Sequence, residues 1–312
     1  MPHDATSRFA ADVAEWLSRT PRELPSQYLY DRLGSALFEA ICRLPWYRIA
    51  TIEQRLLDTH GPAIHAHAGA LTSVVELGPG SGEKLLTLLR ARRTRALDVH
   101  LVDVSTEALE QATATLSTVP DLRVHTHEAT YEAGLVAVAR EGAAGPQLVA
   151  FLGSNIGNFD AARAHALLAS IRSASRSGDL LLLGTDLVKS AEALQLAYDD
   201  PLGVTAAFNR NLLVRINREL GGDFDLDRFA HRAVWNSEAS RVEMHLVSLT
   251  RQRVRIPGAG LDLTFEPGDT IWTESSYKYR ADDLGSRLAD AGYARVEQWT
   301  DDGFALTLAR AV

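Results

Sequence analysis

The chain has 312 residues, of which 46% are hydrophobic and 23% charged, so it is long enough to bury a large core in two domains or one elaborated domain. Its 32 basic and 40 acidic residues leave a net charge of −8 without a basic tract, which argues against nucleic-acid and anionic-membrane surfaces. The single Cys42 excludes a disulfide framework, and no apolar run approaches membrane-spanning length. A cytoplasmic enzyme fits these properties.

The N-terminal part of the chain alternates between helical spacing and proline breaks. Helical spacing runs over 7–17, and Pro21 and Pro25 interrupt it before further helices expected at 36–43 and 51–68. Tyrosines and other aromatics are frequent between Tyr28 and Tyr47. Because a tyrosine hydroxyl needs a hydrogen-bond partner, these side chains could form core or line a pocket.

A glycine-rich turn follows the first predicted strand of the sheet. The β-branched pair Val74 and Val75 precedes Gly78, Gly80 and Gly82, and a helix is expected over 85–89. A strand, a glycine turn and a helix bring backbone N–H groups and a helix N-terminus close to a ligand. A plain structural turn is the alternative, since many folds use such loops.

Two acidic residues make this turn more specific. A second strand over 99–102 ends at Asp103, where a carboxylate can accept hydrogen bonds from ribose hydroxyls. Glu76 stands two positions before Gly78. The resulting pattern, acidic-x-Gly-x-Gly-x-Gly, resembles the cofactor loop of class I S-adenosylmethionine-dependent methyltransferases more than that of dehydrogenases.

Strands and helices continue to alternate up to residue 186. Helices are expected at 106–117 and 161–173, with strands at 122–126, 147–152 and 179–186. Small and amide residues over Gly153–Phe159 follow one strand, where open α/β sheets bind substrates. This alternation predicts a doubly wound parallel sheet.

The alternation stops at Leu187, and helices and β-like runs fill the chain up to 279. A helix at 281–291 and a hairpin of strands at 294–300 and 304–309 then resemble the end of a methyltransferase sheet, whose last strand is antiparallel. We predict an α/β fold with a discontinuous Rossmann-like class I methyltransferase sheet. Residues 51–188 and 280–312 would bind the cofactor, and an α+β domain of 1–50 and 189–279 would bind the substrate.

The histidines do not suggest a metal site. His60, His65 and His67 fall in a predicted helix, while His125 and His127 form a separate His-x-His pair. Metal binding needs three or four ligands in a consistent geometry. We expect no metal and interpret these histidines as surface or capping residues.

Ordered stretches along nearly the whole chain match one known family pattern: Tyr30–Ser35, Leu44–Tyr47, Phe151–Asn158, Leu182–Lys189, Ala197–Asp200, Gly203–Asn209, Ile216–Gly221 and Thr273–Tyr279. On these stretches the chain resembles the histidine-specific Nα-methyltransferases of ergothioneine biosynthesis. The chain departs from the family pattern at Arg48–Thr51 and at Thr130–Tyr131, where the family usually has an acidic residue before the aromatic that contacts adenine.

The resemblance implies a role for each matched position. Tyr47, Glu274 and Ser276 would read the imidazole ring, with Met244 packed beside it. Glu274 and Ser276 are two residues apart, so on a strand they share a face. The substrate carboxylate would bind Asn158 and Tyr198, and the amino group would lie near Tyr30 and the Gly153 carbonyl. The cofactor S-adenosylmethionine would contact Glu76, Gly78, Gly80, Lys84, Asp103, Thr130 and Tyr131.

The expected activity is Nα-methylation of L-histidine by a monomer, with three successive transfers that give the trimethylated betaine. Transfer from a sulfonium is an in-line displacement that relies on positioning and desolvation. One alternative is methylation of another amino acid such as tryptophan, which Glu274 and Met244 disfavour. Another is a non-catalytic relative that binds cofactor or amino acid without turnover.

Overall fold

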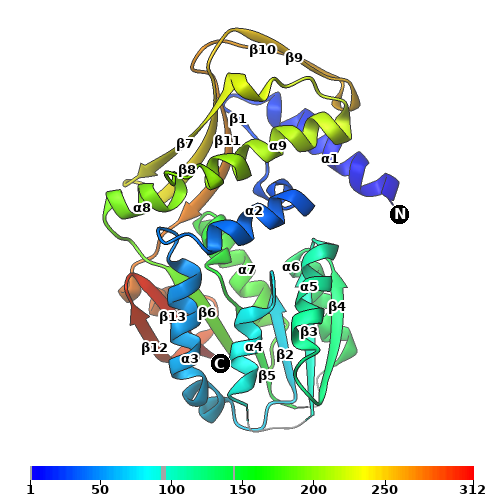
Figure 1. Ribbon diagram of the computed structural model, residues 1–312. Coiled ribbons are helices and arrows are strands. Elements are labelled where there is room, and N and C mark those ends of the chain that lie inside the picture. The colour runs from blue at the N-terminus through cyan, green and yellow to red at the C-terminus, as the bar shows by residue number, and fades with distance from the viewer. Residues whose placement is uncertain (1, 93–95, 143–144) are drawn as a thin grey trace. The chain divides into compact units, whose positions relative to one another are not determined.

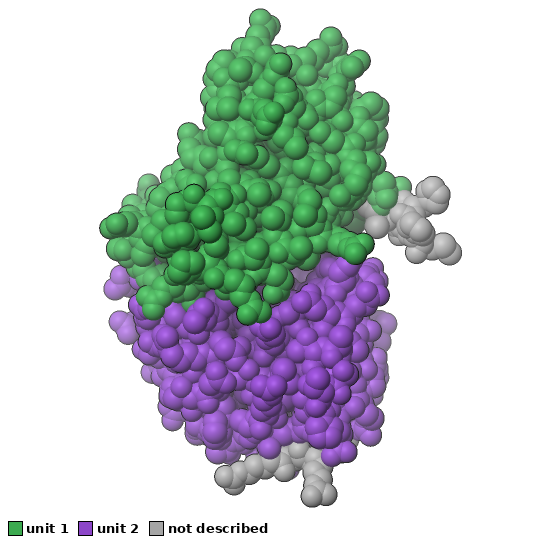
Figure 2. Space-filling model, viewed as in Figure 1, with its two compact units in different colours: residues 1–48, 189–276 green, residues 49–188, 277–312 purple. Residues whose placement is uncertain are grey.

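The computed structural model describes residues 2–92, 96–142 and 145–312. The chain divides into two compact units, each built from two separate stretches (Figure 2). Unit 1 comprises Met1–Arg48 and Lys189–Ser276, and unit 2 comprises Ile49–Val188 and Tyr277–Val312. Within the described ranges, no helix combines the length and the apolar character needed to cross a membrane.

Unit 2 is built on a seven-stranded sheet in the order β12-β13-β6-β5-β2-β3-β4 (Figure 1). Neighbouring strands from β6 to β4 pair in parallel, whereas β13 is antiparallel to both β6 and β12. The predicted doubly wound sheet with an antiparallel last strand is therefore confirmed. The strands are β2 (Ser73–Leu77), β3 (Leu97–Asp103), β4 (Leu122–Glu128), β5 (Gln147–Phe151), β6 (Leu180–Asp186), β12 (Tyr293–Asp301) and β13 (Phe304–Ala311).

Helices cover the sheet of unit 2 on both faces, as the crossover connections of a parallel sheet require. One core packs Val75, Val102 and Phe151 against apolar residues of α6, α7 and α10. The helices of unit 2 are α3 (Ile49–Ala68), α4 (Glu83–Arg90), α5 (Thr106–Leu116), α6 (Tyr131–Glu141), α7 (Ala161–Ser173) and α10 (Leu284–Asp290), with 3-10 turns η2 (Asn155–Asn158) and η5 (Ala281–Asp283).

Helix α6 has no counterpart among the helices expected from the sequence. Thr130 is its N-cap and accepts a hydrogen bond from the Ala133 N–H at 3.4 Å. Leu135 and Val138, three residues apart, are the buried apolar side chains of the helix. A capping residue followed by such a pair is the local signal that indicates this helix.

Unit 1 contains a four-stranded sheet in the order β1-β11-β8-β7 and a separate β9–β10 hairpin. Helix α9 packs against β7 and β8, and α2 packs against α9. The strands are β1 (Arg22–Glu23), β7 (Phe229–Asn236), β8 (Arg241–Ser248), β9 (Gln252–Ile256), β10 (Leu261–Phe265) and β11 (Thr270–Tyr277). The helices are α1 (Pro2–Leu17), α2 (Arg32–Cys42), α8 (Ala191–Tyr198) and α9 (Val204–Leu220), with 3-10 turns η1 (Ser26–Leu29), η3 (Leu226–Arg228) and η4 (Pro257–Ala259).

Candidate functional site

The glycine turn of unit 2 connects β2 to α4, and all three of its glycines have positive φ: +72° at Gly78, +53° at Gly80 and +76° at Gly82. A Cβ on Gly78 would stand 2.6 Å from Asn155 Nδ2 and 2.9 Å from the Tyr131 hydroxyl. A Cβ on Gly80 would meet no described atom within 4 Å. The backbone at Gly80 therefore borders open space that a ligand can enter. At Gly78, in contrast, a larger residue would collide with Asn155 and Tyr131.

A buried carboxylate on α3 connects two of the predicted site residues. Glu53 is fully buried, and its Oε2 lies 2.7 Å from the ammonium of Lys84. Both carboxylate oxygens accept a hydrogen bond from the Gly153 N–H, at 3.0 and 2.8 Å. A Cβ on Gly184 would lie only 2.0 Å from Glu53 Oε1, so a glycine is needed there. Glu53 thus joins the end of β5 to the start of α4.

The Glu76 carboxyl is buried, at 1% exposure, and lacks a full set of partners. Its Oε2 has no hydrogen-bond partner among the described residues. Burial raises the pKa of Glu76 to about 8, with Lys84 opposing the shift and Glu53 and Asp103 adding to it. Three carboxyl groups and one ammonium therefore influence one another here, an arrangement that suits a cationic ligand able to donate hydrogen bonds.

Asp103 ends β3, the strand next to β2. It accepts a hydrogen bond from the Ser105 N–H at 2.9 Å, and burial raises its pKa while the Ser105 and Val104 N–H groups lower it. Burial, with a smaller contribution from Asp103, raises the pKa of Tyr131. Gly78, Asp103 and Tyr131 are therefore brought together at the carboxyl ends of β2 and β3, where open sheets bind their ligands.

The loop after β5 is held in a conformation that is unusual for its residues. Ser154 has a φ of +58°, and its Oγ accepts a hydrogen bond from the Asp186 N–H at 2.9 Å. The Asp186 carboxylate in turn lies 3.0 Å from Lys278 Nζ, and both side chains are buried. This buried pair fixes the loop that contains Gly153 and Asn158, since breaking it would leave an unpaired charge in the core.

In unit 1, aromatic side chains surround Tyr47. Its ring centroid lies 6.2 Å from that of Phe38 and 6.0 Å from that of Tyr198, and Tyr30 is 5.4 Å from Phe38. Burial raises the pKa of the Tyr47 hydroxyl well above its usual value, and Tyr198, Cys42, Tyr30 and Glu274 add to this shift. Tyr47 is therefore protonated at neutral pH and can donate a hydrogen bond.

Residues of β11 complete this cluster. Tyr198 donates a hydrogen bond to Ser276 Oγ at 2.8 Å, and both side chains are buried. Because β11 is a strand through Tyr277, Glu274 and Ser276 lie at alternate positions of the same face. Unit 1 thus holds Tyr47, Tyr198, Glu274 and Ser276 within one cluster of hydroxyl and carboxylate groups.

A polar network that the sequence did not reveal supports β11. The fully buried Asn209 accepts a hydrogen bond from Thr273 Oγ1 at 2.6 Å and donates to the His245 carbonyl at 3.1 Å. Thr273 Oγ1 also lies 3.0 Å from the Met244 carbonyl. This network holds β8 and β11 in place around Met244 and Glu274.

The backbone after Tyr30 is fixed by a helix cap. Asp31 accepts hydrogen bonds from the Gly34 N–H and from Asn211 Nδ2, both at 2.7 Å. A Cβ on Gly34 would stand 1.7 Å from the Leu29 carbonyl oxygen, so only glycine fits. Burial alone would raise the pKa of Asp31, but hydrogen bonds from Arg218, Gly34 and Asn211 lower it overall.

The predicted site residues divide between the two units. Unit 1 contains Tyr30, Tyr47, Tyr198, Met244, Glu274 and Ser276. Unit 2 contains Glu76, Gly78, Gly80, Lys84, Asp103, Thr130, Tyr131, Gly153 and Asn158. Sequence reasoning missed Glu53, Ser154, Asp186, Asn209 and Lys278, all of which are buried and support these residues.

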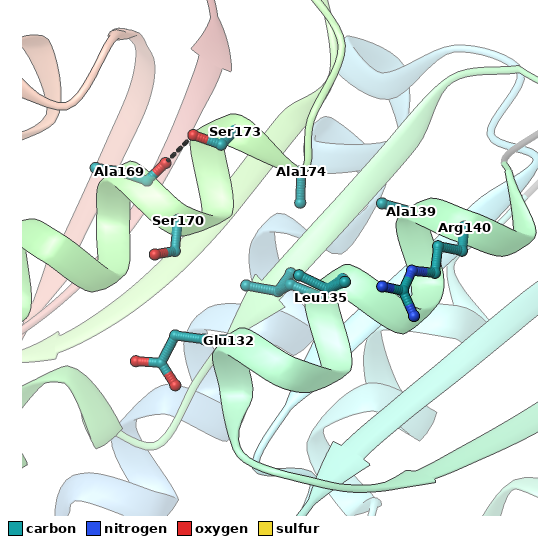
Figure 3. A pocket seen from close by; sticks show the side chains of 9 residues that line it. Glu132, Leu135, Ala139, Arg140, Ala169, Ser170, Ser173 and Ala174 are labelled. Atoms are coloured by element: carbon teal, nitrogen blue, oxygen red, sulfur yellow. Dashed lines mark hydrogen bonds between the residues drawn. The ribbon is translucent and has the colours of Figure 1, made fainter.

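A surface groove of unit 2 lies elsewhere. Its walls come from α6 and α7, and the lining residues include Glu132, Leu135, Arg140 and Ser170 (Figure 3). None of the predicted site residues lines this groove. We therefore assign it no part in ligand binding.

The sequence matches known proteins over almost its full length. The model of a family described as "Histidine-specific methyltransferase, SAM-dependent" matches residues 9–311. The histidine N-alpha-methyltransferase of Mycolicibacterium smegmatis is 41% identical over 310 residues, covering 98% of this chain and 95% of that protein. That of Mycobacterium tuberculosis is 42% identical over 303 residues, covering 96% and 93%. The L-tryptophan methyltransferase of Psilocybe serbica is 27% identical over 330 residues, covering 96% and 91%.

Proposed function

Because the chain belongs to the family of histidine-specific, S-adenosylmethionine-dependent methyltransferases, we propose that it methylates the α-amino nitrogen of L-histidine. The observation that carries this proposal is the identity of 41–42%, over nearly the whole chain, with two relatives named for that reaction. The expected product after three transfers is the trimethylated betaine.

The residues of unit 2 fit S-adenosylmethionine. That cofactor carries an ammonium, a sulfonium and ribose hydroxyls, and when bound it supplies an electrophilic methyl group. The buried Glu76 carboxyl, with Oε2 lacking a partner among the described residues, suits the ammonium. Asp103 suits the ribose hydroxyls, and the backbone at Gly80 leaves space for the ligand. Tyr131 and Thr130 would lie along the adenine.

The cluster in unit 1 fits an imidazole ring. Glu274 can accept the hydrogen of one ring nitrogen, while the hydroxyl of Tyr47 or Ser276 serves the other. The hydrogen bond that Tyr198 donates to Ser276 fixes the position of the Ser276 hydroxyl. A site built from such groups rejects a side chain that cannot pair with them, because its own polar atoms would then be left unpaired.

The attacking amine must lose a proton before each transfer, because only its neutral form has a free lone pair. We propose that the Tyr30 hydroxyl, on the loop that Asp31 and Gly34 hold in place, lies beside this amine. A neighbouring hydroxyl or a water chain is enough to carry the proton away. The contribution of the protein is then to bind, orient and exclude water.

The experiment is a direct survey of substrates. Purified protein is incubated with S-adenosylmethionine and each of the twenty amino acids in turn, and products are identified by mass. We expect histidine alone to gain methyl groups, up to three. Preferential methylation of tryptophan, the substrate in the name of the relative at 27% identity, would replace this proposal by the alternative.

A catalytically silent binding protein is the other alternative, and the same material tests it. Calorimetry would then show that S-adenosylmethionine binds while no amino acid gains mass. The monomeric state stays a prediction, which light scattering of the purified chain tests.

A further inference from the structure

Two histidines and a glutamate converge on one face of the sheet of unit 2. His100 is on β3 and His127 is on the neighbouring edge strand β4, where it pairs with Val102. Positions 100 and 102 of β3 share a face, so His127 lies on the same face as His100. Helix α6 starts just after β4 and packs back along β3 and β4, which brings Glu141 at its end to these histidines.

His100 lies at metal-ligand separations from the other two potential ligand atoms. His100 Nδ1 lies 3.1 Å from His127 Nε2 and 3.6 Å from Glu141 Oε2, and one such atom from each residue lies within 4.8 Å of the others. A tetrahedral ion with bonds of about 2.0–2.2 Å separates its ligands by roughly 3.3–3.6 Å. His100 Nδ1 therefore lies near the tetrahedral separation from both of its partners, and small side-chain rotations would bring all three atoms onto one ion.

We propose that His100, His127 and Glu141 bind a divalent transition-metal ion, with Zn²⁺ as the ion of choice. Two imidazoles and one carboxylate are a ligand set that Zn²⁺ accepts, and a water molecule would take the fourth position. The Glu141 side chain is 48% exposed, so an ion can enter from solvent. The C-terminal end of α6 carries partial negative charge, which further favours a cation.

A third histidine supports the first. The His125 ring stacks on that of His100 with centroids 4.7 Å apart, and His125 Nε2 lies 3.2 Å from Asp98 Oδ1. This stacking, with His125 itself held by Asp98, limits rotation of the His100 ring. Because the ion would tie the edge strand β4 to α6, it would act as a structural clamp of unit 2, and the site requires no part of the methyl-transfer chemistry.

The simpler explanation is a direct hydrogen bond, in which one imidazole donates to the other at the observed 3.1 Å. Titration of the full-length chain with zinc chloride, without a histidine tag and after treatment with a chelator, distinguishes the two. Two substitutions remove ligands, His127→Ala and Glu141→Gln. His165→Ala is the matched control, because His165 is an exposed histidine on α7 away from the cluster.

We expect one zinc equivalent on the wild-type chain and on His165→Ala, with the affinity reduced roughly tenfold or more in both ligand variants. Zinc should also raise the melting temperature of the wild type but not that of Glu141→Gln. Substitution of the exposed Glu141 preserves the core, so this variant gives an answer even if His127→Ala folds poorly. Absence of zinc binding to the wild type, or equal affinity in Glu141→Gln and the control, would overturn the proposal.

Co²⁺ provides a spectroscopic readout of the coordination sphere. In a site with three protein ligands and a water, its visible d–d bands should have the intensity of tetrahedral coordination. These bands should weaken in Glu141→Gln and persist in His165→Ala. Weak octahedral bands that are the same in all variants would contradict a built site.

Discussion

Replacing Glu76 with glutamine should make the ligand-free protein more stable and the cofactor bind more weakly. Burial raises the Glu76 pKa from 4.5 to about 8, so the folded chain keeps a proton that the unfolded chain releases between these two values. The contribution of Glu76 to the free energy of unfolding consequently falls as the pH rises through this window, and this contribution is constant below about pH 4.5. Glutamine does not titrate and removes this loss.

The magnitude follows from the size of the shift. Each pH unit above 4.5 costs about 1.4 kcal/mol, so the wild type loses roughly 3 kcal/mol at pH 7 and about 5 kcal/mol at pH 8. The new amide has an N–H group next to the position where Oε2 lacks a partner, which costs about 1–3 kcal/mol. The net gain is then about 0–2 kcal/mol at pH 7 and about 2–4 kcal/mol at pH 8, and it becomes a loss near pH 5.

Two measurements check this prediction. When the melting temperatures of both proteins are plotted against pH from 5 to 8.5, the two curves should cross. The variant should melt a few degrees higher at the alkaline end. Calorimetric titration with S-adenosylmethionine should show an affinity lower by about 1.5–3 kcal/mol, the worth of a hydrogen bond to a charged group. A stability difference that does not depend on pH, or a variant that is less stable at pH 8, would refute the reasoning.

Three further substitutions test the predicted roles. Asp103→Ala should weaken S-adenosylmethionine binding by about 1–3 kcal/mol in calorimetry, and unchanged affinity would show that Asp103 does not bind the ribose hydroxyls. Glu274→Ala should lower kcat/KM for histidine by at least about a hundredfold while cofactor affinity is kept, and retained preference for histidine over tryptophan would contradict its role. Gly34→Ala should lower the melting temperature, with a loss of at least about 1–3 kcal/mol, because its Cβ would stand 1.7 Å from the Leu29 oxygen; equal melting temperatures would count against this contact.

The sequence predicted most of the sheet because its strands are short apolar runs bounded by glycine and acidic residues. β2 and β6 are buried at every position, as their apolar runs at 74–75 and 180–183 indicated, and this burial extends to the polar residues Glu76 and Asp186. Helix α6 lies outside the predicted helices, because the residues that begin it, Thr130 and Tyr131, match positions that the resembling family uses for adenine. Thr130 is in fact also the cap of that helix.

The supporting residues were harder to predict, because their partners are distant in the chain. Glu53 binds Gly153, a hundred residues away, and Lys278 pairs with Asp186. Glu53 did leave a local signal, since it stands on the apolar face of α3 next to the buried Ile52. A carboxylate in an apolar stripe must find a partner, although the sequence alone does not say which one.

His100 carried a similar signal. It interrupts an otherwise apolar strand between Val99 and Leu101, but only the register of β3 with β4 reveals its histidine neighbours. His125 and His127 are distant from His100 along the chain, but the pairing of β3 with β4 places both of their rings against it.

The chain order of the two units determines when each can finish folding on the ribosome. Arg22 of β1 pairs with Ile271 of β11, so the first strand waits for nearly the whole chain, on the order of ten seconds or more at ~5–20 residues per second. The sheet of unit 2 waits longer still, because β13, the last strand to be made, lies between β6 and β12. During this interval the exposed edge of β6 can pair with other chains, so chaperone demand in synthesis should be set by this late insertion.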